Sequence, residues 1–514
     1  MKIGPKSSGS KPGPICYSMG GREPTITDAN LILGYLNPDY FLGGKIKLNF
    51  ENAKESFENL GKQLSVSWLK AAWGAYDLVC ENMASAARVH VVEKGRDPRN
   101  YSMVCMGGAG PVHAVNVAKK LGISEIIIPP GSGAASAIGM LVSPVSFTVT
   151  RSKPYILNNV DCNEINDLFH KMEQECFKNV AYSKIHKKNF IIERFAEMRL
   201  LGQMHEISIS LSNKDLNKSS LKDIEKSFKN EYSRIYNHIY DDAKIQILNW
   251  KVTIKTVTPF YKSHIKDNYD KNNQITSRQV YFEDYGKLIK TKVYNRYDLS
   301  PGTNLEGPLV VEELESTTIL PPGCKLSIDK YKNIIINLKK SNNTKLDYHQ
   351  SKNFKDLEKK FQSDPIALEI MWSRLINITE ECWETVIRTA FSIIIGECQD
   401  FACELLDSNG NQLVHSPRAM PVFNICLPNA VKSMLKRYPP DSLEPGDVLI
   451  TNDPWLCSGH LYDIAFATPV FKNKKLVAFV GIVGHVSDIG GIRNELSAKE
   501  IYDEGLQIPP LKLF

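Results

Sequence analysis

Two short stretches near the end of the chain each carry a histidine and an aspartate three residues apart. Residues 452–463 read NDPWLCSGHLYD, and residues 484–488 read GHVSD. Neutral imidazole and carboxylate are donor groups that a divalent metal ion accepts. A helical turn or tight loop would direct His460 and Asp463 toward one point. The spacing therefore makes His460, Asp463 and His485 candidate metal ligands.

The apolar run LVAFVGIV between the two boxes predicts a buried strand that ends at Gly484. A hairpin would then return His485 to the side of His460. Asp453 and Asp488 are candidates for orienting the ligands by hydrogen bonds. A lone histidine is more often a surface or core residue than a ligand, so the spacing alone leaves both interpretations open.

A second motif is a pair of glycine-rich turns. In VCMGGAGPVHA, Gly107, Gly108 and Gly110 follow a predicted strand and precede a predicted helix, and PPGSGAASAIG repeats the pattern. Bare amides at a helix N-terminus can face an anion such as a nucleotide phosphate. The alternative is that the glycines only permit tight turns and close packing, which is the commoner role of an isolated glycine cluster.

The elements that must hold these motifs indicate an α/β protein of several domains. A chain of 514 residues is expected to form roughly two to four domains. Residues 51–94 have helical periodicity, 101–142 alternate strand and helix, and short strands dominate 191–340. We expect four segments: an α/β domain at 1–152, a β-rich domain with a helical lead-in at 153–340, a polar linker at 341–363, and a new domain at 364–514 that begins with a long helix.

The composition excludes several classes of protein. The chain is 42% hydrophobic and 23% charged, with a net charge of +6 and lysines scattered without interleaved aromatic residues, so we expect no nucleic-acid partner. No apolar run reaches the ~18–20 residues of a membrane helix, so we expect no membrane span. The eleven cysteines are dispersed without a C-x-x-C pair, and no secretory signal is evident. These features favour a reduced, cytoplasmic chain.

Long ordered stretches of the sequence resemble one superfamily. GPICYSMGGREPTITDANLILGYLNPDYFLGG and ENMASAARVHVVEKGRDPRNYSMVCMGGAGPVHA resemble the C-terminal half of the hydantoinase A/oxoprolinase family, a relative of actin-like and Hsp70-like ATPases. AEMRLLGQMHEISISL and GPLVVEELESTTILPPG resemble that family's C-terminal β-rich domain. DPIALEIMWSRL, DFACELLDSNGNQLVHSP, LEPGDVLITNDPWLCSGHLYD and GHVSDIGG resemble the start of the hydantoinase B/oxoprolinase family.

The resemblance implies a fold and an activity. The fold is a partial ATPase lobe, a β-rich domain and the start of an α+β B-type domain. Members use ATP, with Mg, to activate a carbonyl, either opening a cyclic amide or carboxylating a ketone such as acetone. In the carboxylase relatives a His-x-x-Asp pair and a later histidine hold a metal, which implies Zn, Mn or Fe at His460, Asp463 and His485. The resemblance also implies that Gly107, Gly108 and Gly110 face the nucleotide.

The order of the A-type and B-type segments in one chain favours cyclic-amide hydrolysis of the 5-oxoprolinase or hydantoinase type. The alternatives are a ketone carboxylase, or an inactive fragment that acts only as a subunit. The chain resembles the middle of a fused A–B polypeptide, so we expect an oligomer whose partners include an ATPase lobe and the rest of a B-type region. Where many relatives carry a His-x-Pro-x-His segment, this chain has Arg418 and Phe423. The sequence identifies neither the substrate nor a catalytic residue.

Overall fold

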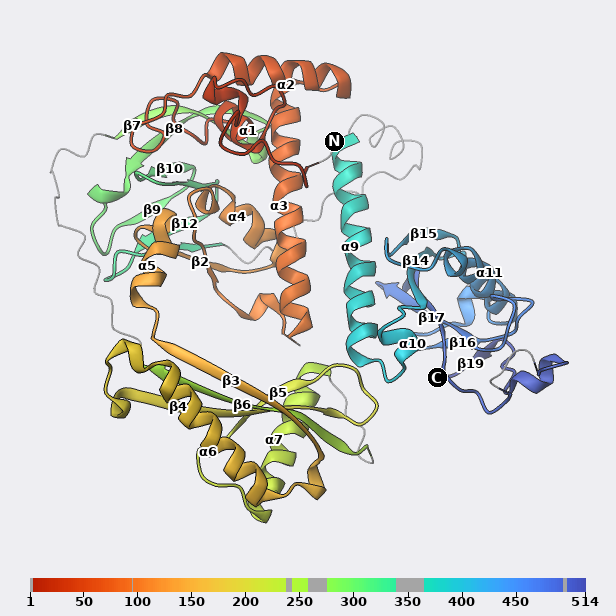
Figure 1. The fold of residues 1–514 in the computed structure, drawn as a ribbon. Helices are drawn as coiled ribbons and strands as arrows, with labels where there is room; N and C mark the ends of the chain where they lie inside the picture. Colours follow the sequence, from red (N-terminus) through yellow and green to blue (C-terminus); the bar gives the residue numbers. More distant parts are fainter. Residues whose placement is uncertain (1–2, 95, 237–242, 258–274, 339–364, 493–496) are drawn as a thin grey trace. The chain divides into compact units, whose positions relative to one another are not determined.

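The computed structural model describes residues 3–94, 96–236, 243–257, 275–338, 365–492 and 497–514 (Figure 1). The chain divides into two compact units. The first unit contains Met1–Val92, Arg96–Ser143 and Pro259–Trp372, and the second contains Glu93–Gly95, Pro144–Thr258 and Ser373–Phe514. Sheets and helices occur in both units, so the expected mixed α/β, multidomain class is confirmed. The expected linker at 341–363 lies outside the described residues.

The first unit contains two sheets with helices packed against them. Their strand orders are β1-β2-β13-β12-β9 and β11-β10-β8-β7. The helices are α1 (Ile26–Ile32), α2 (Phe50–Leu64), α3 (Trp68–Glu93), α4 (Gly110–Leu121) and α5 (Ala135–Val142), and the strands are β1 (Met103–Val104), β2 (Glu125–Ile128), β7 (Thr276–Phe282), β8 (Lys287–Asn295), β9 (Asn304–Glu306), β10 (Leu309–Glu312), β11 (Thr317–Leu320), β12 (Lys325–Ile328) and β13 (Ile334–Asn337). The helical periodicity of 51–94 thus becomes two helices, α2 and α3.

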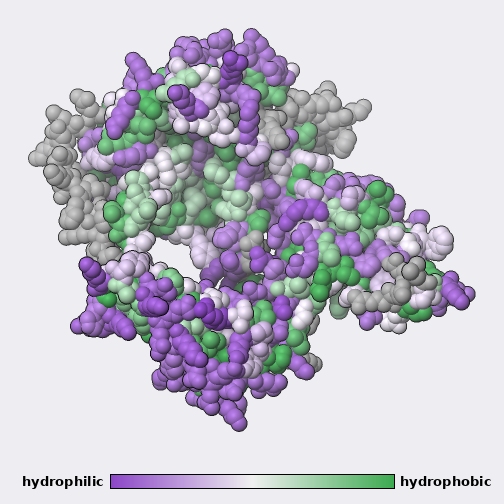
Figure 2. All heavy atoms as spheres, viewed as in Figure 1, coloured by the Kyte–Doolittle hydropathy of each residue, from purple (hydrophilic) through white to green (hydrophobic). Residues whose placement is uncertain are grey.

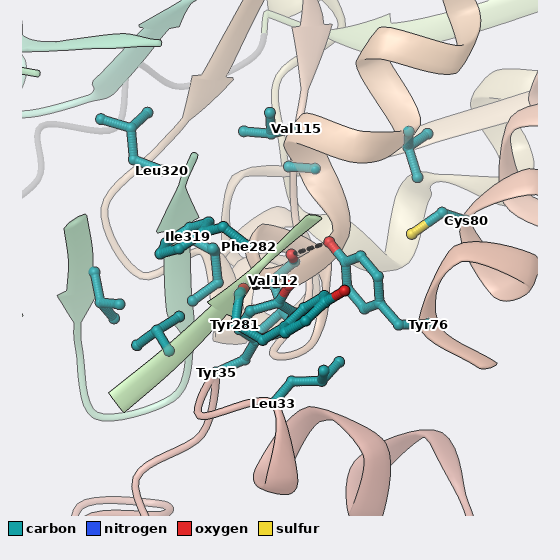
Figure 3. Close-up of a cluster of buried hydrophobic side chains, with 14 of the residues drawn as sticks. Leu33, Tyr35, Tyr76, Cys80, Val112, Val115, Tyr281, Phe282, Ile319 and Leu320 are labelled. Atoms are coloured by element: carbon teal, nitrogen blue, oxygen red, sulfur yellow. Dashed lines mark hydrogen bonds between the residues drawn. The ribbon is translucent and has the colours of Figure 1, made fainter. Parts of the chain in front are cut away.

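The core of this unit joins residues that are far apart in sequence. Figure 3 shows Tyr76 from α3, Val112 from α4 and Tyr281 from β7 packed together. The Tyr76 hydroxyl donates a hydrogen bond to the Val112 carbonyl at 2.9 Å, and the Tyr35 hydroxyl donates to the Tyr281 carbonyl at 3.1 Å. These bonds let large amphipathic rings lie in the core without an unpaired hydroxyl.

The β-rich domain expected over 153–340 is divided between the two units. β13 pairs antiparallel with β2, so that Ile334 lies opposite Ile128. The isoleucines Ile126, Ile128, Ile334 and Ile336 have no exposed surface. Because apolar strands buried in one sheet need their partner strands, residues 275–338 pack with the N-terminal segment in the first unit, and residues 144–258 lie in the second.

Residues 144–258 form one four-stranded antiparallel sheet with two helices on it. The strand order is β3-β6-β4-β5, made of β3 (Ser146–Ile156), β6 (Ile245–Thr256), β4 (Phe190–Leu200) and β5 (Ile207–Leu211). α6 (Cys162–Asn179) and α7 (Lys218–Tyr236) bury residues such as Phe169 and Phe228 against this sheet. The outward surface of α6 is mostly hydrophilic (Figure 2), as expected of an amphipathic helix.

Residues 373–514 contain a six-stranded sheet of order β15-β14-β18-β17-β16-β19. The strands are β14 (Phe401–Asp407), β15 (Gln412–His415), β16 (Leu449–Thr451), β17 (Asp463–Lys472), β18 (Lys475–His485) and β19 (Leu511–Lys512). The expected long helix is α9 (Pro365–Thr389); α10 (Ile393–Gly396) and α11 (Pro421–Arg437) follow. Among the described residues, every helix is too short or too polar to cross a lipid bilayer.

Candidate metal centre

A tight hairpin brings the two histidine–aspartate boxes together. β17 and β18 are joined by Asn473 and Lys474, whose φ angles are +52° and +63°. Two residues with positive φ form the turn whose twist matches that of the flanking strands. The turn pairs Lys472 with Lys475, and a bulge between Val470 and Phe471 then shifts the register by one residue, so that Asp463 lies opposite His485. The strand predicted from LVAFVGIV is confirmed, and it ends at His485.

Asp463 lies between the two histidines. Its Oδ2 is 2.7 Å from His460 Nε2, and its Oδ1 is 2.9 Å from His485 Nδ1. One ligand atom from each of the three residues lies within 4.8 Å of the others. Asp463 is only 3% exposed, whereas both histidines are half-buried. The carboxylate is therefore fixed within the fold, and the imidazoles reach the surface.

Burial alone would raise the pKa of Asp463. Hydrogen bonds from His460 and Ser458 and the charges of the two histidines outweigh it, so the pKa of this carboxyl is lowered from its usual value. The Ser458 hydroxyl donates directly to Asp463 Oδ2. The fold thus stabilises the ionised form of Asp463, which is the form that binds a cation.

The donor set fits a divalent ion. Atoms that share one ion through bonds of about 2.0–2.3 Å lie within roughly 4.6 Å of each other, so small side-chain rotations would bring these three donors onto one ion. Two imidazoles and one carboxylate are also the ligand types of three-ligand sites that keep a position open for water or substrate.

The carboxylates of Asp453 and Asp488 each accept a hydrogen bond from a backbone amide of the turn in which they lie. Asp453 Oδ1 accepts a hydrogen bond from the Trp455 amide at 3.0 Å, and Asp488 Oδ1 accepts one from the Gly490 amide at 2.8 Å. Two described side chains that contact the candidate ligands are Ser458, described above, and Tyr462.

The Tyr462 ring stacks on His485 with a centroid separation of 5.5 Å and an interplanar angle of 12°. Sequence reasoning missed Ser458 and Tyr462. Their presence inside the first box was the only available signal.

Arg418 and Phe423 make contacts within the fold. Arg418 pairs with Glu380 and Glu384 of α9, at 2.9 and 2.8 Å, and lies over the Trp383 ring. Phe423 is 2% exposed in the core under α11. Arg418 therefore makes ion pairs with α9, and Phe423 packs in the hydrophobic core of the same sheet.

The glycine turns lie where the sequence predicted, but their amides are partly engaged. Gly107 and Gly108 lie between β1 and α4. The Gly107 amide donates to the Ser132 carbonyl at 2.8 Å, and the Gly110 amide donates to the Gly107 carbonyl at 3.2 Å. A Cβ on Gly108 would lie 3.0 Å from the Glu315 carbonyl oxygen. Close packing thus explains part of the glycine requirement.

Gly108 also lines a pocket of about 240 Å³. This volume is slightly below the range of about 300–1,000 Å³ usual for small-molecule sites. The pocket contains three glutamates and no lysine, arginine or histidine; its lining is Tyr17, Thr27, Asn30, Leu36, Asn37, Tyr40, Phe41, Leu42, Gly108, Ala109, Val112, Glu312, Glu313, Leu314, Glu315, Ser316 and Thr317. Glu312 pairs with Arg278 and Glu313 with Arg296, so two of the three negative charges are offset and Glu315 is the carboxylate that disfavours an anion nearby.

A mixed α/β fold of several sheets with a histidine–aspartate centre defines the class of this protein. Family models match three consecutive segments: Hydantoinase/oxoprolinase over residues 1–149, the Hydantoinase/oxoprolinase C-terminal domain over 157–341, and Hydantoinase B/oxoprolinase over 364–514. The chain belongs to the hydantoinase/oxoprolinase family, as its sequence motifs predicted.

The curated relatives include characterised enzymes. The chain is 29% identical to 5-oxoprolinase 1 of Arabidopsis thaliana, over 100% of this chain and 41% of the relative. It is 29% identical to the 5-oxoprolinase of Saccharomyces cerevisiae, over 99% of this chain and 40% of the relative. It is 30% identical to the caprolactamase subunit alpha of Pseudomonas jessenii, over 64% of this chain and 48% of the relative. The chain thus spans less than half of each relative's length.

Two solved structures have a similar fold. The ATP-dependent caprolactamase from Pseudomonas jessenii matches with a TM-score of 0.58 and 28% identity, over 65% of this chain and 49% of that chain. A nucleotide-free acetone carboxylase matches with a TM-score of 0.52 and 20% identity, over 66% of this chain and 50% of that chain. The second similarity concerns the fold alone.

Proposed function

We propose that this chain takes part in ATP-dependent hydrolysis of a cyclic amide. The observation that carries the proposal is the His460–Asp463–His485 cluster, in a chain that is similar to 5-oxoprolinases along its whole length. ATP dependence is printed for the similar caprolactamase structure. The proposed reaction transfers the γ-phosphoryl group of ATP to the carbonyl oxygen of the amide and releases ADP. Water then adds to the activated carbon, the ring C–N bond breaks to give an amine and a carboxylate, and inorganic phosphate leaves.

His460, Asp463 and His485 would hold a divalent ion, Zn, Mn or Fe. When bound, such an ion would supply a Lewis acid that polarises an oxygen or lowers the pKa of a bound water. Ser458 and the strand register hold Asp463 in place, and Tyr462 restricts the ring plane of His485. These contacts fix the donors before a ligand arrives, which lowers the reorganisation that binding requires.

The pocket beside Gly108 is the proposed nucleotide site, in what we take to be part of an actin-like ATPase lobe. Its lining contains no lysine, arginine or histidine that could bind phosphate, so we assign the pocket to the nucleoside end of Mg-bound ATP. Glu315 is exposed at this pocket, and Tyr17, Tyr40 and Phe41 supply aromatic surface for a base. The phosphates would then extend away from the pocket toward groups of opposite charge. We also propose that the chain works with further subunits, since one similar protein is named as a subunit.

The metal assignment can be tested on the complete 514-residue chain. We expect chains loaded with Zn, Mn or Fe and then dialysed to retain about one ion each. His485→Ala and Asp463→Asn should lose that ion. His415→Ala is the matched control, because His415 is exposed on β15 of the same sheet. Full retention of metal by His485→Ala would contradict the assignment.

The reaction class is tested separately by ATP turnover. Phosphate release should rise when a five- or seven-membered lactam is added to the chain together with its partner subunits. Stimulation by acetone and bicarbonate instead of by a lactam would identify the ketone carboxylase alternative.

A further inference from the structure

A pair of thiols lies close to the candidate metal centre. Cys426 belongs to α11, and Cys457 lies in the turn between β16 and β17. Both are free cysteines, and their side chains pack on the same hydrophobic core. The two thiols are hydrogen-bonded to each other. Sulfur atoms in such contact need only a short approach to become bonded as a disulfide.

The turn that carries Cys457 also supports the metal centre. The Cys457 amide donates a hydrogen bond to the Asp453 carbonyl oxygen at 2.9 Å, which closes this turn. The next residue is Ser458, whose hydroxyl donates to Asp463 Oδ2. Because Cys457 and Ser458 are adjacent, a movement of Cys457 toward α11 also moves Ser458 relative to Asp463.

The helix on the other side of the thiol pair lacks a backbone hydrogen bond near Cys426. Pro428 lies inside α11, and a proline has no N–H group to donate to the carbonyl four residues earlier. That carbonyl, of Asn424, accepts a hydrogen bond from the Gln412 side chain at 3.2 Å. The turn of α11 that carries Cys426 therefore shifts more easily than a regular helical turn.

The two thiols differ in exposure and in acidity. Cys457 is half-buried, whereas Cys426 is only 7% exposed. The hydrogen bond between them lowers the pKa of Cys457, and the same bond together with burial raises the pKa of Cys426. A more acidic, accessible thiol beside a second thiol is the arrangement found in cysteines that oxidise reversibly.

We propose that Cys426 and Cys457 form a reversible disulfide when the chain meets a peroxide, and that this disulfide weakens metal binding at the candidate metal centre. The second half of the inference rests on the proposed function. The disulfide draws Cys457 toward α11 and takes the Ser458 hydroxyl away from Asp463. Groups that orient a metal ligand contribute to metal affinity, so their displacement lowers it.

The oxidant is a hydroperoxide, here hydrogen peroxide. The Cys457 thiolate attacks one peroxide oxygen, so that an S–O bond forms, the O–O bond breaks, and the second oxygen leaves as water. The Cys426 sulfur then attacks the sulfenic acid on Cys457. The S–S bond forms, the S–O bond breaks, and that oxygen leaves as a second water. The two thiols together give two electrons and two protons to the peroxide.

The disulfide can be detected without the metal. The complete 514-residue chain is freed of metal by a chelator, treated with hydrogen peroxide and digested without reductant. We expect a cross-linked peptide that contains Cys426 and Cys457, lighter than its two parts by two hydrogen atoms and separated by dithiothreitol. Cys457→Ser should not form it. Cys398→Ser is the matched control, since Cys398 is an exposed cysteine of the same domain, and it should form the cross-link as wild type does.

The effect on the metal is measured after the peroxide has been removed. The metal that the reduced chain retains is titrated into the reduced and the oxidised chain. We expect the oxidised chain to bind it about 10–100 times more weakly, the usual effect of losing a group that orients a ligand. Dithiothreitol should restore the affinity. Peroxide treatment should leave the metal affinity of Cys457→Ser unchanged.

The other outcomes also decide the question. Absence of the cross-linked peptide from peroxide-treated wild type would overturn the inference. The inference also fails if the disulfide forms but the oxidised and reduced chains bind the metal equally. A reduced chain that binds no metal would contradict the proposed function, and with it the effect of the disulfide on the metal. The peptide analysis would then still decide whether the two cysteines pair, so the two failures are distinguishable.

Discussion

Two buried carboxyl groups in this chain have pKa values shifted in opposite directions. Asp463 accepts hydrogen bonds from two histidines and a serine, and its pKa is lowered. Glu404, on β14 of the same sheet, has no exposed surface, and burial raises its pKa to about 8 although Gln412 offsets part of the effect. The Asp463 carboxyl is therefore ionised and can bind a cation, whereas the Glu404 carboxyl stays protonated at neutral pH.

Glu404 makes the stability of the protein depend on pH. The folded chain keeps the proton up to about pH 8, whereas an unfolded glutamate releases it above about pH 4.3. Between these values the free energy of unfolding should fall by up to ~1.4 kcal/mol for each pH unit gained. Glu404→Gln should remove this slope and be more stable than wild type at pH 8, as measured by denaturant unfolding at pH 5 and 8.

The control for that experiment is Glu444→Gln, which changes an exposed glutamate in the same domain and should leave the pH slope as it is. An unchanged slope in Glu404→Gln would show that Glu404 is ionised in the folded protein.

Gly133 provides a second prediction at a single residue. A Cβ at this position would lie 2.4 Å from the Glu315 Cβ, so Gly133→Ala should lower the free energy of unfolding by about 1–3 kcal/mol through overpacking. Gly139→Ala is the matched control: Gly139 lies in α5 with nothing within 4 Å of the added Cβ, and alanine there should be neutral or stabilising. Thermal unfolding of the two variants measures the difference, and equal midpoints would refute the overpacking argument.

At the scale of single elements, the β17–β18 hairpin determines whether the candidate ligands meet. A slip of one residue in its register would turn every side chain of one strand to the other face of the sheet. The two turn residues and the bulge between Val470 and Phe471 together fix that register, although Asn473-Lys474 lacks the glycine that usually follows asparagine in such turns.

Substitutions in this turn should change stability and metal binding together. Lys474→Gly should raise the free energy of unfolding by up to ~1 kcal/mol, because glycine adopts positive φ without strain. Lys474→Val should lower it and reduce the metal retained per chain, while Lys472→Val, at an exposed strand position, should not. The denaturant midpoint measures the change in stability, and the metal content per chain measures the change in metal binding. Full metal retention by a clearly destabilised Lys474→Val chain would separate the site from the turn.

The sequence predicted this element well because its signals are local. Alternating and apolar runs define β17 and β18, and the spacing of the boxes indicated their meeting point. It did not predict that Phe401 of β14 pairs with Gly484, because this contact depends on pairing β18 with a strand about 80 residues earlier. Asp453 and Asp488 each satisfy a turn amide through Oδ1, and their role in orienting the ligands stays a prediction.

At the scale of the whole molecule, the first unit is discontinuous. Residues 144–258 separate β2 from its partner β13. The expected segments 1–152 and 153–340 agree with the residues that the family models match, but the sequence did not show that strands on either side of residue 258 join different units. Short strands before and after residue 258 have the same composition, and only long-range pairing shows that they belong to different units.

This organisation predicts the behaviour of fragments. Residues 144–258 have their own core, which includes the fully buried Phe169, Phe228 and Trp250, so this fragment should fold and unfold cooperatively by itself. Residues 1–143 should not, because their sheet ends at β2 with an uncovered apolar edge. Circular dichroism during thermal unfolding provides the measurement. Joining residues 275–338 to the N-terminal fragment should restore a cooperative transition, and cooperative unfolding of residues 1–143 alone would contradict the argument.

The pairing of β2 with β13 also has a consequence for synthesis on the ribosome. About 200 residues separate the two strands, and at ~5–20 residues per second they emerge roughly 10–40 seconds apart. During that interval residues 144–258 can complete their core, whereas Ile126 and Ile128 of β2 remain unpaired with Ile336 and Ile334 of β13. Residues 144–258 should therefore fold before the first unit does. In the nascent chain, the apolar strand β2 is exposed during this interval and is a segment that a chaperone would bind.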